Sequence, residues 1–290
     1  MSLFQPSQLF HFLESIGHKP SKRLSQNFLI DGNILRKILA AAHLQPGDLV
    51  IEIGPGPGVL TQGLLQQDVT VLAIEKDRLF AKALERLQTP SHKLHVFQED
   101  ILSFPLEEKL ASFVTNSKKA KLISNLPYHL TAPIFSKILP LENFLDTVIV
   151  MVQKEVAERM VAKKNSKNYS SFSLFTQFYS DPKLLFLVSP NSFYPAPKIT
   201  SAVVECKLKP PPVGIDPMAF TLFVRKAFAT RRKMLITSLK TAIDKERLLS
   251  ALATLHLDEK VRPENLSLEE FLNLFKLLYG PSPFCKGLLL

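Results

Sequence analysis

Four consecutive residues, Asn125-Leu126-Pro127-Tyr128, could recognise and activate an amino group on a nucleobase. Such an amine is a poor nucleophile because its lone pair is delocalised into the ring. The carboxamide oxygen of Asn125 and the carbonyl of Leu126 could accept its two N–H bonds, and Pro127, with no N–H and a fixed φ, could hold that carbonyl toward the site. Tyr128 could stack on the base, a contact worth roughly 1–3 kcal/mol. We therefore predict a catalytic role for these four residues, with a simple Asx turn at a strand end as the alternative.

A second aromatic segment, Phe193-Tyr194-Pro195-Ala196-Pro197-Lys198, could complete a site for a base. Phe193 could cover the face of an extruded base that Tyr128 leaves open, which is the geometry that base-modifying enzymes use. Lys198 belongs to the same proline-rich loop and could contact a phosphate. A packing role for Phe193 stays open, because the chain contains 21 phenylalanines.

A glycine-rich loop, Gly54-Pro55-Gly56-Pro57-Gly58, follows an apolar run at 49–53. Glycines there let the backbone approach a ligand without a Cβ clash. The spacing differs from the G-x-G-x-x-G fingerprint of dinucleotide sites, and the Gly-Lys-Ser/Thr ending of a P-loop is absent. Glu75, at the end of the next apolar run, could accept both hydroxyls of a ribose, and Asp100 could reach an adenine amino group. Together these residues favour S-adenosylmethionine over NAD as the cofactor.

These residues need an alternating β/α framework to hold them together. Short apolar runs predict strands at 49–53, 69–74, 94–97, 121–124 and 146–152, with helical patterns at 60–65 and 78–87. This alternation indicates βαβ units, and near-continuous apolar runs suit parallel strands covered on both faces. Two further runs, 183–188 and 200–208, predict an antiparallel addition at the sheet edge.

The proline-rich segment around 210–214 marks the expected domain boundary, and helical periodicity follows it at 217–241, 244–255 and 267–279. We therefore predict an α/β fold with two domains. Residues 1–212, with the N-terminal segment 1–30 included, would form a Rossmann-like S-adenosylmethionine-dependent methyltransferase domain. Residues 213–290 would form a small C-terminal helical domain that docks RNA.

The predicted helix over 217–241 carries a cluster of basic side chains. Residues seven apart on one helix share a face, so Arg225 would lie with Arg232, and Lys226 with Lys233. We predict that phosphate groups are bound by Arg225, Lys226, Arg231, Arg232 and Lys233. The alternative is an ordinary solvated helix face.

Composition narrows the choice of partner. The chain of 290 residues holds 36 Lys and Arg against 26 Asp and Glu, a net charge of +10, which suits a nucleic acid or an anionic membrane surface. Its apolar runs are too short to span a bilayer, and its first 20 residues lack the order of a secretory signal. The two cysteines, Cys206 and Cys285, form neither a disulfide framework nor a four-ligand zinc site. A reduced, cytoplasmic protein without a metal is expected.

Taken together, the motifs resemble those of the ribosomal RNA adenine N6,N6-dimethyltransferases of the KsgA/RsmA type over nearly the whole chain. The segments that carry the resemblance are KRLSQNFL at 22–29, EIGPGPGVLT at 52–61, SNLPY at 124–128, QKEVAERM at 153–160, FYPAPKITSAVV at 193–204, the basic residues at 225–233 and RPENLS at 262–267. The resemblance implies that the cofactor S-adenosylmethionine contacts Asn27, Leu29, Gly54, Glu75, Asp100 and Asn125. It also implies dimethylation of N6 on two adjacent adenosines near the 3′ end of small-subunit (16S) ribosomal RNA, coupled to assembly of the small subunit.

Three alternatives remain open at this point. Ser25 stands where many bacterial members have glycine, and the SQNF sequence also occurs in the Erm-type enzymes that methylate large-subunit (23S) RNA. A DNA adenine methyltransferase would typically show a D/N-P-P-Y motif, which is absent. A non-catalytic assembly or transcription factor on the same fold is the third. The chemistry we expect is direct in-line methyl transfer by a monomer, with no metal and no strong general base.

Overall fold

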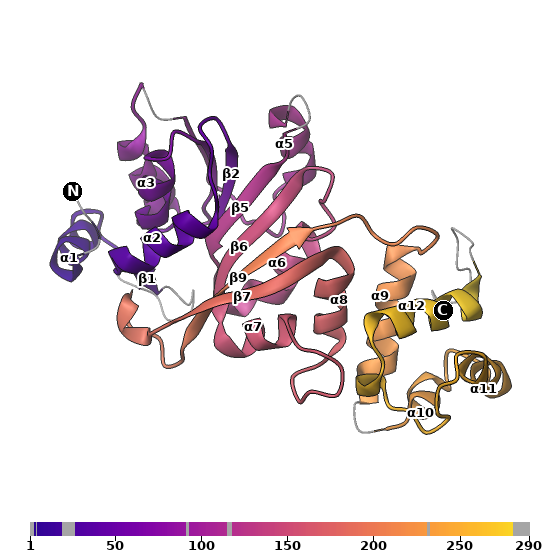
Figure 1. Cartoon of the computed structure of the whole chain (residues 1–290). Helices are drawn as coiled ribbons and strands as arrows, with labels where there is room; N and C mark the ends of the chain where they lie inside the picture. Colours follow the sequence, from indigo (N-terminus) through magenta and orange to yellow (C-terminus); the bar gives the residue numbers. More distant parts are fainter. Residues whose placement is uncertain are drawn as a thin grey trace. The chain divides into compact units, whose positions relative to one another are not determined.

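A seven-stranded sheet forms the centre of the first of two units into which the chain divides (Figure 1). The computed structural model describes residues 3, 5–18, 27–90, 93–114, 118–230 and 233–280. Unit 1 consists of Met1–Ala157 and Asp181–Lys209, and unit 2 consists of Glu158–Ser180 and Pro210–Leu290. The second unit thus includes a stretch before residue 212 that the sequence pattern did not assign to it. Whether 1–212 and 213–290 are independent folding domains stays a prediction.

The strands follow the order β4-β3-β2-β5-β6-β9-β7. Their bounds are β2 Leu49–Ile53, β3 Thr70–Ile74, β4 Leu94–Phe97, β5 Ala120–Asn125, β6 Leu145–Gln153, β7 Ser180–Val188 and β9 Ser201–Leu208. β2 pairs in parallel with β3 and β5, β3 with β4, and β5 with β6, whereas β9 runs antiparallel to β6. The predicted α/β class and its antiparallel addition are confirmed. β9 lies between β6 and β7, as the neighbouring ribbons in Figure 1 show.

Two helices of unit 1, α2 and α4, begin where an aspartate side chain caps their free N–H groups. Asp31 accepts hydrogen bonds from two backbone N–H groups at the start of α2, and Asp77 does the same for α4. The helical segments are α1 Pro6–Ser15, α2 Gly32–Ala41, α3 Val59–Leu65, α4 Arg78–Leu84 with η2 Glu85–Leu87, α5 Leu106–Phe113, η3 Tyr128–Leu130, α6 Thr131–Ile138 and η4 Pro190–Ser192; α7 Lys154–Met160 crosses into unit 2. A separate two-stranded sheet joins β1 Phe28–Leu29 to β8 Phe193–Tyr194.

Apolar residues of the central strands form the core that fixes the strand ends. Val50, Val71 and Ile123 have no exposed surface, and they pack in one cluster with Leu35 and Leu64 from the covering helices. Burial of this kind contributes about 25 cal/mol for each Å² of apolar surface removed from water. The close-packed core of strands and helices therefore fixes the position of the loops that follow the strands.

Unit 2 is a helical unit with an aromatic core. Its elements are α8 Ser171–Tyr179, α9 Pro217–Ala227, η5 Phe228–Thr230, α10 Leu235–Leu239, α11 Lys245–Thr254, η6 Pro263–Asn265 and α12 Leu268–Tyr279. Phe178 of α8 stacks on Phe220 of α9 at 4.9 Å between ring centroids, and Phe220 meets Phe275 of α12 at 5.5 Å. The Tyr169 hydroxyl donates to the Leu266 carbonyl at 2.9 Å. These contacts explain why 158–180 belong to the helical unit.

The single helix expected over 217–241 is wrong. α9 ends at Ala227, and α10 begins only at Leu235. The Phe228 ring packs against Phe271, and the Leu235 N–H donates to the Val261 carbonyl at 2.8 Å, so tertiary contacts break the helix between them. Lys233 lies in this break, and Arg231 and Arg232 lie outside the described residues. The argument that residues seven apart share one helical face therefore does not apply.

Candidate functional site

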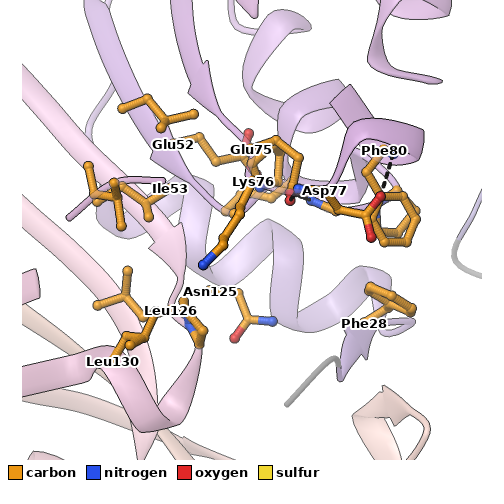
Figure 2. A pocket seen from close by; sticks show the side chains of 18 of the residues that line it. Phe28, Glu52, Ile53, Glu75, Lys76, Asp77, Phe80, Asn125, Leu126 and Leu130 are labelled. Atoms are coloured by element: carbon orange, nitrogen blue, oxygen red, sulfur yellow. Dashed lines mark hydrogen bonds between the residues drawn. The ribbon is translucent and has the colours of Figure 1, made fainter. Parts of the chain in front are cut away.

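A pocket of about 440 Å³ lies where the strands β2, β3 and β5 end. It is lined by residues of the glycine loop, by residues following β3 and β4, and by the segment 125–130. The carboxyl ends of parallel strands are the usual place for a ligand in such a sheet, and the volume suits a small molecule. Figure 2 shows Glu75 and Asp77 on one side of the pocket and Asn125 and Leu126 on the other.

Glu75 is fixed by the backbone on both of its carboxylate oxygens. Its Oε2 accepts from the Gly56 N–H at 2.9 Å, and its Oε1 accepts from the Asp77 N–H at 2.8 Å. Burial raises the pKa of Glu75, while these two hydrogen bonds act in the opposite direction. Each carboxylate oxygen can accept more than one hydrogen bond. Glu75 can therefore still accept the hydroxyl groups of a bound ribose.

Positive φ angles shape the glycine loop. Gly56 has a φ of +53°, and a Cβ on it would lie 3.1 Å from the Phe28 ring. Gly58 has a φ of +85°, and its Cβ would lie 2.7 Å from Leu84. The Arg86 guanidinium donates to the Pro57 carbonyl between them. The loop thus needs glycine for its backbone conformation and for the space around it.

Two further titratable groups, Glu52 and Lys76, line the pocket next to the expected residues. Glu52 is 2% exposed and accepts from the Thr61 hydroxyl at 2.6 Å. Burial, with a contribution from the nearby charge of Glu75, raises the pKa of Glu52 to about 8. Lys76 pairs with Asp100 at 2.8 Å, and this hydrogen bond lowers the pKa of Asp100. Asp100 is therefore an ionised acceptor at the pocket, as a contact with an amino group requires.

Asn125 has one satisfied and one unsatisfied end. Its Nδ2 donates to the Asn27 carbonyl at 3.1 Å, whereas its Oδ1 is buried and has no hydrogen-bond partner among the described residues. A buried polar atom without a partner is rare, and at a pocket it indicates a place for a ligand donor. The next N–H, from Leu126, is taken by the Met151 carbonyl at 3.1 Å. Asn125 thus lines the pocket and carries a buried acceptor that is not satisfied.

The two expected aromatic partners are placed differently. Tyr128 lines the pocket, and its hydroxyl hydrogen bonds to the Ser201 hydroxyl at 2.5 Å. Burial raises the pKa of Tyr128, so the phenol stays neutral. Phe193 is 2% exposed, pairs with Leu29 between β1 and β8, and packs into the core instead of lining the pocket. Its role in covering a base stays a prediction and requires that its ring become exposed.

The pocket brings together most of the residues expected from the sequence. Among its lining residues are Asn27, Leu29, Gly54, Glu75, Asp100, Asn125, Leu126, Pro127 and Tyr128. Phe28, Glu52, Lys76, Asp77 and Phe80 also line it and were not foreseen. Two of these residues could have been noticed in the sequence. Glu52 is a carboxylate inside an apolar strand, and Asp77 stands where a helix begins, and a carboxylate at either position indicates a specific contact.

The expected RNA contacts lie outside this pocket. Lys198 is exposed in the loop between β8 and β9, while Arg225 and Lys233 are exposed and Lys226 half-buried in unit 2. Within the described residues, no group of three or more His, Cys, Asp or Glu side chains could hold a metal ion. None of the described helices has the length and apolar character needed to cross a membrane.

Comparisons with known proteins identify the family of this chain. A model of the family described as "Ribosomal RNA adenine dimethylase" matches residues 17–279. The chain is 50% identical over 280 residues to "Ribosomal RNA small subunit methyltransferase A" of Protochlamydia amoebophila, covering 97% of this chain and 99% of that protein. It is 44% identical over 276 residues to the protein of the same name from Chlamydia muridarum, covering 93% and 96%.

Solved structures share the fold. A dimethyladenosine transferase from Plasmodium falciparum matches with a TM-score of 0.72 and 25% identity, over 86% of this chain and 96% of that one. The 23S rRNA methyltransferase ErmE matches with a TM-score of 0.65 and 23% identity, over 87% and 99%. The family match extends from the segment before β1 to the end of α12, and so includes every element that lines the pocket. The chain is therefore a member of the ribosomal RNA adenine dimethylase family.

Proposed function

We propose that this protein transfers methyl groups from S-adenosylmethionine to N6 of two adjacent adenosines near the 3′ end of small-subunit ribosomal RNA. The observation that carries the proposal is the buried Oδ1 of Asn125, a pocket-lining residue, which has no hydrogen-bond partner among the described residues. An exocyclic amine supplies the donor that this oxygen lacks. The small-subunit RNA is the substrate in the names of the relatives that are 50% and 44% identical.

The pocket suits S-adenosylmethionine, the cofactor of this family. Glu75 offers acceptors for the ribose hydroxyls, and Asp100 offers one for the adenine amino group. Gly54, where an added Cβ would meet only Pro127 at 3.9 Å, leaves room for a ligand close to the backbone, and Asn27 and Leu29 line the same pocket. When bound, the cofactor supplies a methyl group made electrophilic by a sulfonium centre.

The chain's own groups would prepare the amine for attack. Asn125 Oδ1 and the Leu126 carbonyl accept the two N–H bonds, which favours a pyramidal nitrogen and frees its lone pair for the methyl group. The Leu126 N–H is bound to Met151, and Pro127 has no N–H to compete. Tyr128 stacks on the base, held at its hydroxyl by Ser201. Catalysis then comes from position and from electrostatics around N6.

No side chain needs to act as a strong base in this scheme. After transfer the nitrogen carries a positive charge and releases its proton to water. The pocket provides fixed acceptors in place of a base, and we propose that the reaction is independent of metal. We also propose that the enzyme acts as a cytoplasmic monomer on immature small subunits, with Lys198, Arg225, Lys226, Arg231, Arg232 and Lys233 among its RNA contacts.

The choice of substrate can be tested with the full chain. Purified protein and labelled S-adenosylmethionine are incubated with immature small-subunit particles or with protein-free large-subunit RNA, and the methylated nucleosides are identified by mass spectrometry. We expect N6,N6-dimethyladenosine at two adjacent positions of the small-subunit RNA and none in the other RNA. Methylation confined to the large-subunit RNA would instead assign the Erm-type activity. Particle maturation without methylation would assign a non-catalytic role.

A further inference from the structure

His18 lies behind the wall of the cofactor pocket, just after the end of α1. The backbone N–H of His18 donates to the Leu13 carbonyl at 2.8 Å, and the side chain is only 7% exposed. The imidazole ring lies against the Phe80 ring at 4.2 Å between centroids and meets the edge of Phe28 at 6.5 Å. Both phenylalanines line the pocket, and Figure 2 shows them on the right of the view. The ring of His18 therefore supports the pocket wall from outside.

The same ring also makes one polar contact with the pocket. His18 Nε2 lies 3.3 Å from Oδ2 of Asp77, and because a carboxylate only accepts, the Nε2–H is the donor. The other carboxylate oxygen, Oδ1, accepts from the Leu79 N–H at 2.8 Å and so caps α4. The two oxygens of Asp77 thus hold two different parts of the chain. Oδ2 serves His18 alone among the contacts described.

Asp77 in turn fixes the carboxylate of Glu75, the group that would bind the ribose. Its backbone N–H donates to Glu75 Oε1 at 2.8 Å, and the Gly56 N–H holds Oε2 at 2.9 Å. The orientation of the Glu75 carboxylate therefore depends on where the Asp77 backbone lies. Fixing an acceptor before the ligand arrives reduces the ordering cost of binding.

We propose that His18 is a positioning residue for cofactor binding, which holds Asp77 and through it the Glu75 carboxylate in the orientation that receives the ribose hydroxyls. The inference rests on the proposed function, in which Glu75 binds the ribose of S-adenosylmethionine. It gives His18, which is not among the residues that line the pocket, an indirect part in cofactor affinity. The packing of His18 on Phe80 is a separate contribution, which an aromatic replacement preserves.

The test compares His18→Phe with the matched variant His11→Phe. His18→Phe keeps an aromatic ring against Phe80 and removes the hydrogen bond to Asp77. His11 lies on α1, seven residues before His18, with its side chain 73% exposed, so its replacement controls for the loss of a histidine near the N-terminus. Each full-length protein is titrated with S-adenosylhomocysteine and with the 2′,3′-dideoxy analogue of that compound, which lacks the hydroxyls that Glu75 would bind.

We expect His18→Phe to bind S-adenosylhomocysteine about three- to tenfold more weakly, the equivalent of one hydrogen bond. Affinity for the dideoxy analogue should be unchanged, and so should both affinities of His11→Phe. In turnover assays the KM for S-adenosylmethionine should rise with kcat retained. If His18→Phe lost affinity equally for both ligands, or lost affinity for neither, the proposal would be overturned. Failure of the wild-type protein to bind S-adenosylhomocysteine would instead count against the proposed function itself.

Discussion

Asn125 combines two tasks that need the two ends of a carboxamide. Its Nδ2 holds the backbone of Asn27, which belongs to the segment leading into β1, while its Oδ1 is kept for a donor from the pocket. An aspartate in this position would direct a second acceptor at the Asn27 carbonyl, and an alanine would satisfy neither. The amide thus links the segment that closes the cofactor pocket to the group that meets the substrate.

Glu52 should make the stability of the ligand-free protein depend on pH. Its pKa is raised from 4.5 to about 8, mainly by burial. Between these two values the folded chain holds a proton that the unfolded chain releases, so the free energy of unfolding falls as pH rises. The contribution, present in full below about pH 4.5, declines by up to about 1.4 kcal/mol per pH unit and is lost as pH passes about 8.

Glu52→Gln should remove this decline. Glutamine keeps an acceptor for the Thr61 hydroxyl but carries no proton to lose. Denaturant unfolding at pH 5, 6, 7 and 8 should therefore show a flatter profile for this variant than for the wild type. The control is Glu107→Gln, a charge change on the exposed face of α5, which should follow the wild-type profile. Parallel profiles for Glu52→Gln and the wild type would show that Glu52 is ionised throughout this range.

At the scale of elements, the turn into α3 depends on Gly58. Its φ of +85° is unfavourable for other residues, and an added Cβ would lie 2.7 Å from Leu84 of α4. We expect Gly58→Ala to destabilise the protein by about 1–3 kcal/mol through strain and crowding. Gly47→Ala is the matched control, because Gly47 has a φ of +80° but nothing within 4 Å of its Cβ. Equal loss of stability in the two variants, measured by denaturant unfolding, would exclude the crowding.

The sequence pattern predicts elements well where burial is local. The runs at 49–53 and 94–97 match β2 and β4, because an apolar run bounded by turn residues encodes a buried strand. The sequence pattern fails where a contact between distant residues determines the secondary structure. The helix expected over 217–241 is an example, because the backbone hydrogen bond between Leu235 and Val261 interrupts it. Strands of two residues, such as β1 and β8, are too short to show any periodicity.

In the candidate site, too, some residues could be predicted from the sequence and others could not. Gly54, Glu75, Asp100 and Asn125 stand at successive strand ends, so their convergence follows from the parallel sheet. The role of Asn27 and Leu29 was implied only by resemblance, since no spacing connects them to the sheet. Contacts such as the one between His18 and Asp77 join residues 59 positions apart and depend on side-chain packing. Spacing in the sequence does not encode them.

At the scale of the whole molecule, the net charge of +10 should govern binding to RNA. Residues 211–290 hold 12 basic against 8 acidic side chains, and Lys198 adds an exposed charge in the loop before β9. Affinity for the small-subunit RNA should therefore fall steeply between 50 and 200 mM salt, roughly tenfold or more for several phosphate contacts. Filter binding across this range measures the slope. A flat response would contradict an electrostatic docking surface.

Single replacements should locate that surface. Lys198→Ala and Arg225→Ala remove exposed charges in unit 1 and unit 2. Each should reduce the slope of the logarithm of the binding constant against the logarithm of the salt concentration by about one if its side chain binds a phosphate. Lys240→Ala removes an exposed lysine next to α10 that is not among the proposed contacts. Unchanged slopes in the first two variants would place the RNA elsewhere.

The central claim, that Asn125 activates the adenine amine, is tested most directly by the methylation rate of Asn125→Ala. The variant is compared with Asn143→Ala, which changes an exposed asparagine in the turn before β6. Mass spectrometry of the small-subunit RNA should show no dimethyladenosine from Asn125→Ala and wild-type amounts from Asn143→Ala, while Asn125→Ala retains measurable binding of S-adenosylhomocysteine. Wild-type rates of methylation by Asn125→Ala would contradict the account.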